Sequence, residues 1–160
     1  MFRKSRKLFG LIAVVMIASL LLAACAPKTA TTSPSTTEVE VPEPSNPGGP
    51  GEAVNLTGDA KAGADVFATN CSVCHGDQGK GGVPNPGSTD GTVPPLAPID
   101  PGLVSTDAKT FTTNVDLFIE HGSKPEGESP SKVMIAFGDQ KVLTPQQIAD
   151  VIAYVISLNK

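Results

Sequence analysis

Two cysteines and a histidine lie close together near the middle of the chain, in the segment Cys71-Ser72-Val73-Cys74-His75. This C-x-x-C-H spacing is typical of covalent haem attachment. Two thiols three positions apart near a helix end can reach the two vinyl groups on one edge of a porphyrin, and the next imidazole then points at the iron. The segment therefore predicts one covalently bound haem c, attached to Cys71 and Cys74 and ligated by His75.

The same segment has other interpretations. In an oxidising compartment Cys71 and Cys74 can form a disulfide, and C-x-x-C is also the redox motif of thioredoxin-like proteins. That motif needs a βαβ context, and no part of this chain alternates as strands do. Zinc needs further ligands, but the chain has only three cysteines and two histidines. An incidental match is the remaining alternative. An export signal at the start of the chain and a helix before Cys71, both described below, favour haem.

Elimination narrows the candidates for the second axial ligand of the iron. If residues 1–24 are removed during export, two of the three methionines are lost and Met134 is the only one left. A thioether from Met134 would complete a His/Met iron site and raise its reduction potential. His121 would instead give a two-histidine site of lower potential, but it ends an amphipathic segment and is expected at the surface. An open or exchangeable position is the third alternative.

The chain begins with a pattern typical of bacterial export and lipidation. Four basic residues precede an apolar run of 15 residues over 8–22, and the sequence Leu-Ala-Ala-Cys then ends at Cys25. Such a start is typical of a signal peptide, and a cysteine after the cleavage point resembles the lipoprotein signal. We expect residues 1–24 to be removed and Cys25 to be acylated, for example with palmitate. An uncleaved membrane helix is the alternative, although the run is shorter than the roughly 20 residues that cross a bilayer.

Removal of residues 1–24 would make the chain strongly acidic. It takes four of the 12 basic residues and none of the 16 acidic ones, so the net charge becomes −8. Nucleic-acid binding needs a basic face, and adhesion to anionic lipid needs a basic patch, so lipid on Cys25 must provide the membrane anchor. A redox partner with a basic docking patch would suit this charge. A solvated acidic surface explains the charge equally well.

Composition divides the rest of the chain into a tether and one domain. Residues 25–55 are rich in Pro, Thr, Ser, Gly and Glu, so we expect a disordered tether with a reach on the order of 30 Å. Residues 56–160 are expected to form a single monohaem domain. Either form of the N-terminal segment places this domain on the outer face of the plasma membrane or in the periplasm.

Three helices are predicted in the domain. The first covers 59–70 and the second 107–120. The third has the strongest signals, because Thr144 and Gln147 form a T-x-x-Q capping box with a proline at the first helical position. A Gly- and Pro-rich stretch at 76–102 is too long for a compact domain unless something packs against it. The chain has no Trp and one Tyr, so we expect a small core that needs further stabilisation, for example by a covalent cofactor.

These residues resemble the class I cytochrome c family over about residues 58–160. In that family the first and last helices cross beside the haem, where a small residue and an aromatic on the first helix meet an aromatic on the last. Gly63, Phe67 and Tyr154 match this pattern. The resemblance implies an all-α, cytochrome c-like fold with long Gly- and Pro-rich loops.

The family also has a P-x-L element after the haem motif, which Pro94-Pro95-Leu96 matches. The resemblance implies that the Pro94 carbonyl accepts a hydrogen bond from Nδ1–H of His75, which would fix the imidazole and its donor strength. It also implies that Leu96 packs on the haem ring. Pro84 is an alternative for the role of Pro94.

The resemblance implies one-electron transfer in a respiratory or photosynthetic chain. Redox proteins or a membrane complex would be the partners, with no small-molecule substrate and no enzymatic activity. The lipoprotein signal with a tethered monohaem domain also resembles the small cytochrome subunits of quinol-oxidising complexes such as alternative complex III. The alternatives are a haem-based ligand sensor or peroxidase-like protein with a labile distal ligand, and a lipoprotein that uses haem only to fold. Peroxide chemistry usually needs His or Arg above an open iron, and beyond residue 24 the chain has no Arg.

Overall fold

The computed structural model describes residues 43–160, so the predicted signal peptide and the lipidation site at Cys25 lie outside the described residues. Over 43–160 the only regular elements are helices, accompanied by two isolated β-bridges. The elements are, in order, η1 (Glu52–Asn55), α2 (Ala60–Asn70), α3 (Ser72–His75), η2 (Asp77–Gly79), η3 (Pro101–Leu103), α4 (Ala108–His121) and α5 (Pro145–Ser157). The predicted all-α fold is confirmed. None of the described helices combines the length and hydrophobicity that crossing a membrane requires.

All three long helices have a side-chain cap at the N-terminus, and the cap of α5 is the one that the sequence predicts. Asp59 and Asp107 accept hydrogen bonds from backbone N–H groups in the first turns of α2 and α4, and Thr144 and Gln147 form both halves of the capping box of α5. These caps satisfy N–H groups that have no partner within their helix. α4 ends at Gly122, whose φ of 73° a glycine adopts without strain.

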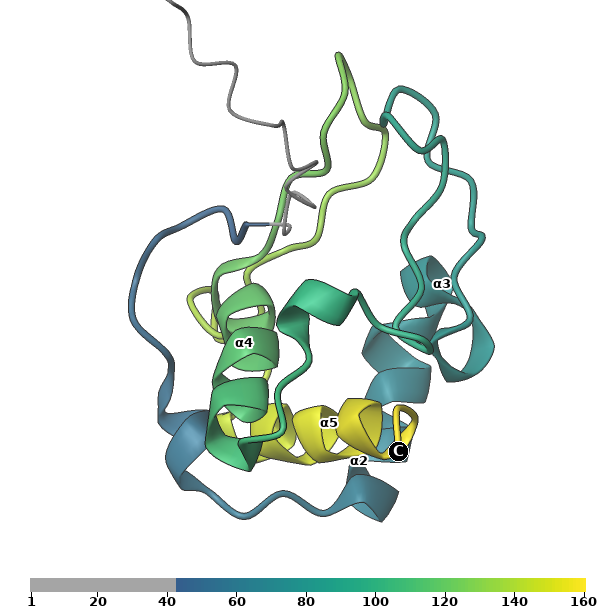
Figure 1. Ribbon diagram of the computed structural model, residues 1–160. Helices are drawn as coiled ribbons and strands as arrows, with labels where there is room; N and C mark the ends of the chain where they lie inside the picture. Colours follow the sequence, from purple (N-terminus) through teal and green to yellow (C-terminus); the bar gives the residue numbers. More distant parts are fainter. Residues whose placement is uncertain (1–42) are drawn as a thin grey trace, which may run out of the picture. The chain divides into compact units, whose positions relative to one another are not determined.

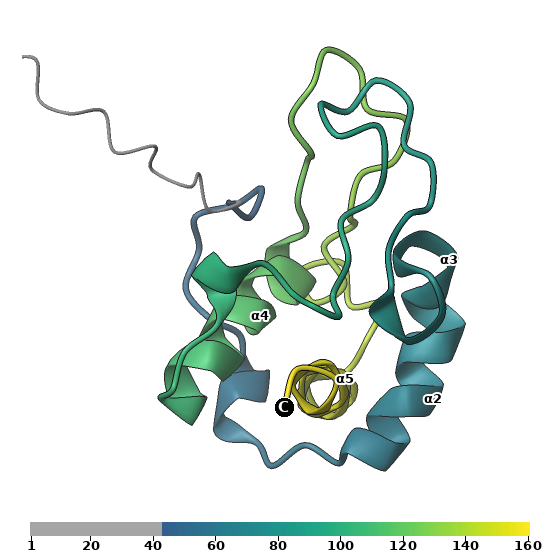
Figure 2. The ribbon, with the colours of Figure 1, turned by 45° about the vertical axis from the view of Figure 1, so that its right-hand side comes forward.

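α2 and α5 cross in close contact, and together with α4 they form what we name the helical frame. A methyl group at Gly63 would collide with the backbone carbonyl of Asp150, so the absence of a side chain lets the two helices approach. One turn further along α2, the rings of Phe67 and Tyr154 pack with their centroids 5.2 Å apart. Figure 2 views α5 end-on, with α2 on one side and α4 on the other. The predicted crossing of the first and last helices is therefore present.

The hydrophobic core fills the space where α5 meets α2, α4 and η1. Ile148, Val151 and Ile152 lie on the apolar side of α5, and each exposes only 1% of its surface. Burial of a side chain of this size contributes about 1.5–3 kcal/mol. Apolar burial therefore stabilises the helical frame.

Residues 43–55, which we name the strap, pack against the helical frame instead of continuing the predicted tether. Ala53 in η1 exposes 1% and is part of the core. The N–H of Gly51 donates to a carboxylate oxygen of Asp116 in α4, at 2.7 Å. The packed part of the chain thus begins before residue 56, where composition places the start of the domain. Composition misses the strap because single contacts from a Pro- and Gly-rich backbone leave no periodic pattern.

Two long loops extend from the frame beside one another. We name them the Pro94 loop (residues 79–97) and the Met134 loop (residues 123–134). They are drawn in teal and in green to yellow-green in Figure 1, and they lie together in Figure 2 as well. The N–H of Thr89 in the first loop donates to the carbonyl of Glu126 in the second, at 2.8 Å. The Gly- and Pro-rich stretch therefore has the packing partner that its length requires.

Candidate haem site

The proposed attachment segment begins where α2 ends. Cys71 is the C-cap residue of α2, and the single turn of α3 carries Cys74 and His75. The N–H groups of Cys74 and His75 both donate to the carbonyl of Cys71, at 3.1 and 2.9 Å. Both thiols are free and half-buried. One rigid turn at the end of α2 thus carries two unbridged thiols and an imidazole.

The surroundings of the thiols do not favour nucleophilic chemistry. Burial raises the pKa of Cys71 to about 11, and the nearby Cys74 adds to the increase. Dithiol oxidoreductases depend instead on a cysteine whose lowered pKa makes it a thiolate near neutral pH. A thioredoxin-like role therefore has no support here. A zinc site has none either, since no group of three or more Cys, His, Asp or Glu side chains within 43–160 is arranged to hold a metal.

His75 is oriented by the Pro94 loop. Its Nδ1 lies 3.2 Å from the Pro94 carbonyl oxygen, and because a carbonyl only accepts, Nδ1 carries the proton and donates. Nε2 makes no hydrogen bond to any residue in the described range, and its lone pair is available to a metal. Burial lowers the pKa of His75, although the bond to Pro94 opposes this shift. The ring is therefore held in the neutral form, with the tautomer that a metal ligand needs.

Leu96 lies in the same loop and is half-buried against the core. Its N–H donates to the Gly79 carbonyl at 2.7 Å, and its carbonyl accepts a bond from the Asn159 side chain, also at 2.7 Å. The carboxamide oxygen of Asn159 accepts the N–H of Ile99 at 2.9 Å. Asn159 thus connects the end of α5 to the Pro94 loop. The sequence does not reveal this role, because a polar residue after a terminal helix is ordinarily solvated.

Met134 is half-buried and packs against the core at the base of its loop. Its neighbours Val133 and Ile135 are 52% and 42% exposed. This alternation is typical of an extended segment with one side facing the protein, and Met134 is on the inward side. The backbone of Met134 exchanges two hydrogen bonds with Ser123, at 2.8 and 3.0 Å, so its position along the loop is fixed.

His121 differs from the prediction that it lies at the surface. The residue is only 8% exposed, because the strap covers it. Nδ1 lies 2.9 Å from a carboxylate oxygen of Asp139 and Nε2 lies 2.9 Å from the carbonyl of Gly49. Both partners are acceptors, so each ring nitrogen carries a proton, and the bond to Asp139 raises the pKa of His121. With both nitrogens engaged, His121 is unsuited to be an iron ligand.

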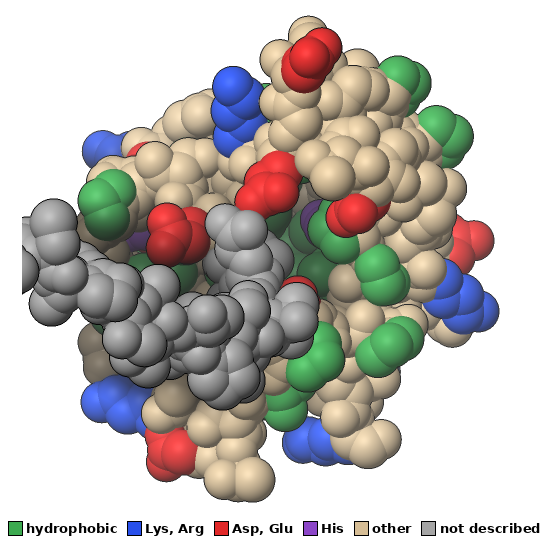
Figure 3. Space-filling view, turned by 45° about the horizontal axis from the view of Figure 1, so that its top comes forward, with side chains coloured by type: hydrophobic (Ala, Val, Ile, Leu, Met, Phe, Trp, Pro, Cys, Tyr) green, Lys and Arg blue, Asp and Glu red, His purple; other side chains and the backbone are tan. Residues whose placement is uncertain are grey.

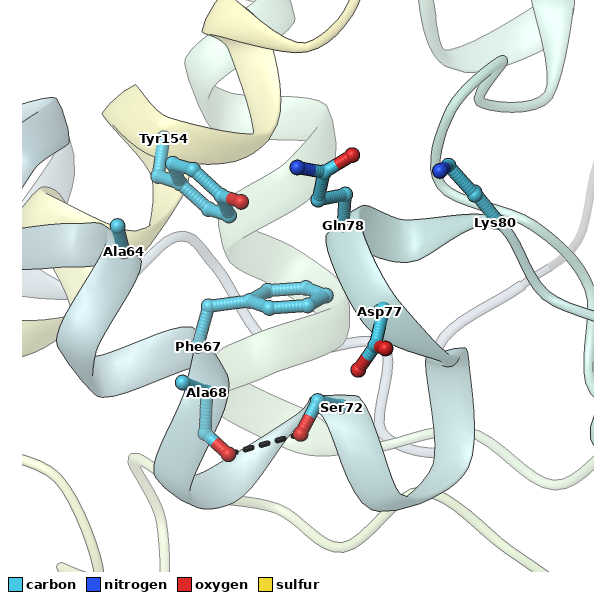
Figure 4. Close-up of a pocket in the computed structure, with 8 residues that line it drawn as sticks. All are labelled: Ala64, Phe67, Ala68, Ser72, Asp77, Gln78, Lys80 and Tyr154. Atoms are coloured by element: carbon cyan, nitrogen blue, oxygen red, sulfur yellow. Dashed lines mark hydrogen bonds between the residues drawn. The ribbon is translucent and has the colours of Figure 1, made fainter.

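The face of the domain drawn in Figure 3 is hollowed, with hydrophobic side chains around the hollow and a histidine side chain inside it. A pocket of about 400 Å³ lies over the α2–α5 crossing. Figure 4 shows Phe67 and Tyr154 on one side of this pocket, with Gln78 and Lys80 nearby. None of the cysteines, His75 or Met134 is among the residues that line it.

The residues present fit a covalently attached haem. Two unbridged thiols stand on the turn that carries the histidine, and the histidine keeps Nε2 uncommitted within the described part of the chain. Cys71 and Cys74 would form the thioether bonds, and His75 and Met134 would be the axial ligands. When bound, the group supplies reversible one-electron chemistry at iron.

Comparison with known proteins agrees with this chemistry. The family model described as Cytochrome c matches residues 60–159. The cbb3-type cytochrome c oxidase subunit FixP of Sinorhizobium medicae is 32% identical over 99 residues, which are 62% of this chain and 30% of that protein. The cbb3-type cytochrome c oxidase subunit CcoP of Rhodobacter capsulatus is 38% identical over 103 residues, which are 62% of this chain and 29% of that protein. No solved structure matches the chain significantly.

The family match runs from the first turn of α2 past the end of α5 and includes the whole attachment segment. It thus spans the helix crossing, the thiols, His75 and both long loops. The chain belongs to the cytochrome c family, and its cofactor is covalently bound haem c.

Proposed function

We propose that the chain transfers single electrons through its haem c, with His75 and Met134 as the axial ligands, in a respiratory electron-transport chain. The observation that carries the proposal is the placement of His75 on the turn of the two free thiols, with Nδ1 bonded to Pro94 at 3.2 Å. A ligand fixed in this way keeps its position and donor strength when the charge on the metal changes. Small rearrangement between oxidation states favours fast electron transfer.

The partner is proposed to be a membrane oxidoreductase complex. Three relatives are named as subunits of cbb3-type oxidases, which supports a terminal oxidase as the electron acceptor. The chain spans only about 30% of the length of these relatives, so the proposal concerns the cytochrome domain alone. A quinol-oxidising complex such as alternative complex III is the other candidate. Stopped-flow mixing of the reduced protein with each purified complex would separate the two, since only an electron acceptor oxidises it rapidly.

Lipid on Cys25 is proposed to anchor the domain on the outer side of the plasma membrane. The support is the sequence pattern before Cys25 and the net charge of −8 beyond it, which disfavours electrostatic adhesion to anionic lipid. Cys25→Ser should move the protein from the membrane fraction to the soluble fraction without changing its haem spectrum. A variant that stays with the membrane would contradict lipid anchoring.

Spectra of the full chain in both oxidation states test the electron-transfer proposal. We expect one covalent haem per chain, a reversible one-electron titration, and complete loss of covalent haem in the double variant Cys71→Ala/Cys74→Ala. Met134→Leu should abolish the sulfur-to-ferric-iron charge-transfer band, whereas His121→Gln should preserve it. Carbon monoxide binding to the unaltered ferrous protein at neutral pH would instead indicate a ligand sensor with a labile distal position.

A further inference from the structure

The most buried polar side chain between the two loops is that of Asn85, which is 0% exposed. Its Oδ1 accepts the N–H of Lys132 at 2.7 Å, and its Nδ2 donates to the carbonyl of Lys132 at 3.0 Å. The hydroxyl of Ser131 adds a bond to Oδ1 at 3.2 Å. One carboxamide thus pairs with both backbone groups of a single residue in the Met134 loop, as a neighbouring strand would.

On its own side, Asn85 is tied to Pro94 by the backbone. The N–H of Asn85 donates to the carbonyl of Gly91 at 2.8 Å, and the N–H of Val93 donates to the carbonyl of Val83, also at 2.8 Å. These bonds fold the loop back on itself, so that Asn85 and Pro94 move together. Pro94 is the residue whose carbonyl holds the histidine ring.

On the opposite side, the residue that Asn85 holds is close to the methionine. Lys132 lies two positions before Met134 in an extended segment, and Ser123 fixes Met134 by two backbone hydrogen bonds. A displacement of Lys132 along the loop is therefore transmitted directly to Met134.

We propose that Asn85 is a positioning residue for the iron site. It sets the register of the Met134 loop against the Pro94 loop, and thereby the separation between the sulfur of Met134 and the imidazole of His75. This inference rests on the proposed ligation by Met134. Without the carboxamide, the partly buried N–H and C=O of Lys132 lose their partners, which is costly. The loop then moves, and external ligands compete more successfully with the thioether.

The chemistry of the contact selects asparagine at this position. An amide presents one acceptor and one donor in a fixed plane, which matches the N–H and C=O of Lys132. An ionised carboxylate has nearly the same shape but only accepts hydrogen bonds. The variant Asn85→Asp therefore keeps the acceptor of the pair and removes the donor, whereas Asn85→Ala removes both.

Imidazole binding to the ferric holoprotein tests the proposal, with the charge-transfer band as a second readout. Asn85→Ala should bind imidazole at least about tenfold more tightly than the unaltered protein, equivalent to about 1.4 kcal/mol, and should have a weaker band. The imidazole affinity of Asn85→Asp should lie between those of the unaltered protein and Asn85→Ala. If Asn85→Ala retains no haem, Asn85→Asp alone provides the test. Asn114→Ala is the matched control, because its side chain also donates to a backbone carbonyl, that of Leu103 at 3.0 Å, which lies in η3 and outside both loops.

Imidazole affinities equal to that of the unaltered protein in both Asn85 variants would overturn the proposal, as would an equal gain in Asn114→Ala. Met134→Leu in the same assay distinguishes a wrong role for Asn85 from a wrong assignment of Met134 as the iron ligand. If Met134 is the ligand, Met134→Leu binds imidazole far more tightly than the unaltered protein. If Met134→Leu behaves like the unaltered protein, the axial assignment itself is wrong and the role of Asn85 falls with it.

Discussion

The helical frame and the pair of loops are stabilised by different forces. In the frame, the most deeply buried side chains are largely aliphatic, such as Ile148 and Ile152 at 1% exposure. Between the loops, the fully buried side chain is the carboxamide of Asn85, and backbone hydrogen bonds supply most of the other connections. Apolar burial is strong but not directional, whereas hydrogen bonds are individually weak but fix geometry. Changes in the frame should therefore alter global stability, and changes in the loops should alter ligation of the iron.

The comparison can be tested at Gly63 in the frame and Gly87 between the loops, because each of these glycines faces a backbone carbonyl. Gly63→Ala should produce the largest effect, because its methyl group would collide with the Asp150 carbonyl and force α2 and α5 apart. We expect a loss of about 3 kcal/mol in the free energy of unfolding, measured by denaturant titration of the holoprotein. Gly49→Ala is the control, since nothing lies within 4 Å of its added methyl group. Equal losses in the two variants would contradict close packing at the crossing.

Gly87→Ala makes the same kind of change between the loops. Its methyl group would collide with the Ser129 carbonyl, and its φ of +83° is unfavourable for alanine. We expect a smaller loss of stability, about 1–2 kcal/mol, together with a weaker methionine charge-transfer band, which Gly63→Ala should leave intact. The comparison fails if Gly87→Ala lowers stability as much as Gly63→Ala without affecting the band.

The smallest effect that we expect is a dependence on pH of how firmly the strap is held against the frame. The bond to Asp139 raises the pKa of His121 above its ordinary 6.5, so its stabilising contribution is complete below 6.5 and is lost as pH rises through the folded value. Burial also raises the pKa values of Asp116 and Glu120, and their ionisation weakens the folded state in the same direction, at lower pH.

Amide hydrogen exchange at Ser45 and Gly51, whose N–H groups anchor the strap, measures this dependence after correction for intrinsic rates. Protection should fall from pH 6 to pH 8, by on the order of tenfold, the size of one hydrogen bond. The effect is limited because the side chain of Asp139 is 42% exposed and screened by water. His121→Gln should remove most of the change. Protection that increases with pH in the unaltered protein would contradict this role of His121.

The sequence predicts the frame much better than the loops. The hydrophobic spacing over 59–70 and 107–120 and the capping box of Thr144 and Gln147 are local signals, and the structure confirms the helices that they predict. The positions of the strap and of Asn85 depend on contacts between residues more than 45 positions apart, and no local pattern encodes them.

In the candidate site, too, the local features are predicted from the sequence and the long-range contacts are not. The attachment segment is contiguous, so its spacing is sufficient to predict the chemistry, and the family resemblance points to Pro94, which lies at hydrogen-bond distance from His75. The prediction of an exposed His121 was wrong because it considered only the helix that carries the residue. The strap covers His121 from elsewhere in the chain, and its Pro- and Gly-rich composition predicts a tether instead.

The strap also fixes the point from which the domain would be held at a membrane. Its first anchored N–H, that of Ser45, is bonded to Gly122 at 2.8 Å, and Gly122 lies directly against the backbone of Met134. A lipid at Cys25 would therefore pull on the domain beside Met134. If the domain is anchored as proposed, any force from the membrane would thus reach it on its methionine side.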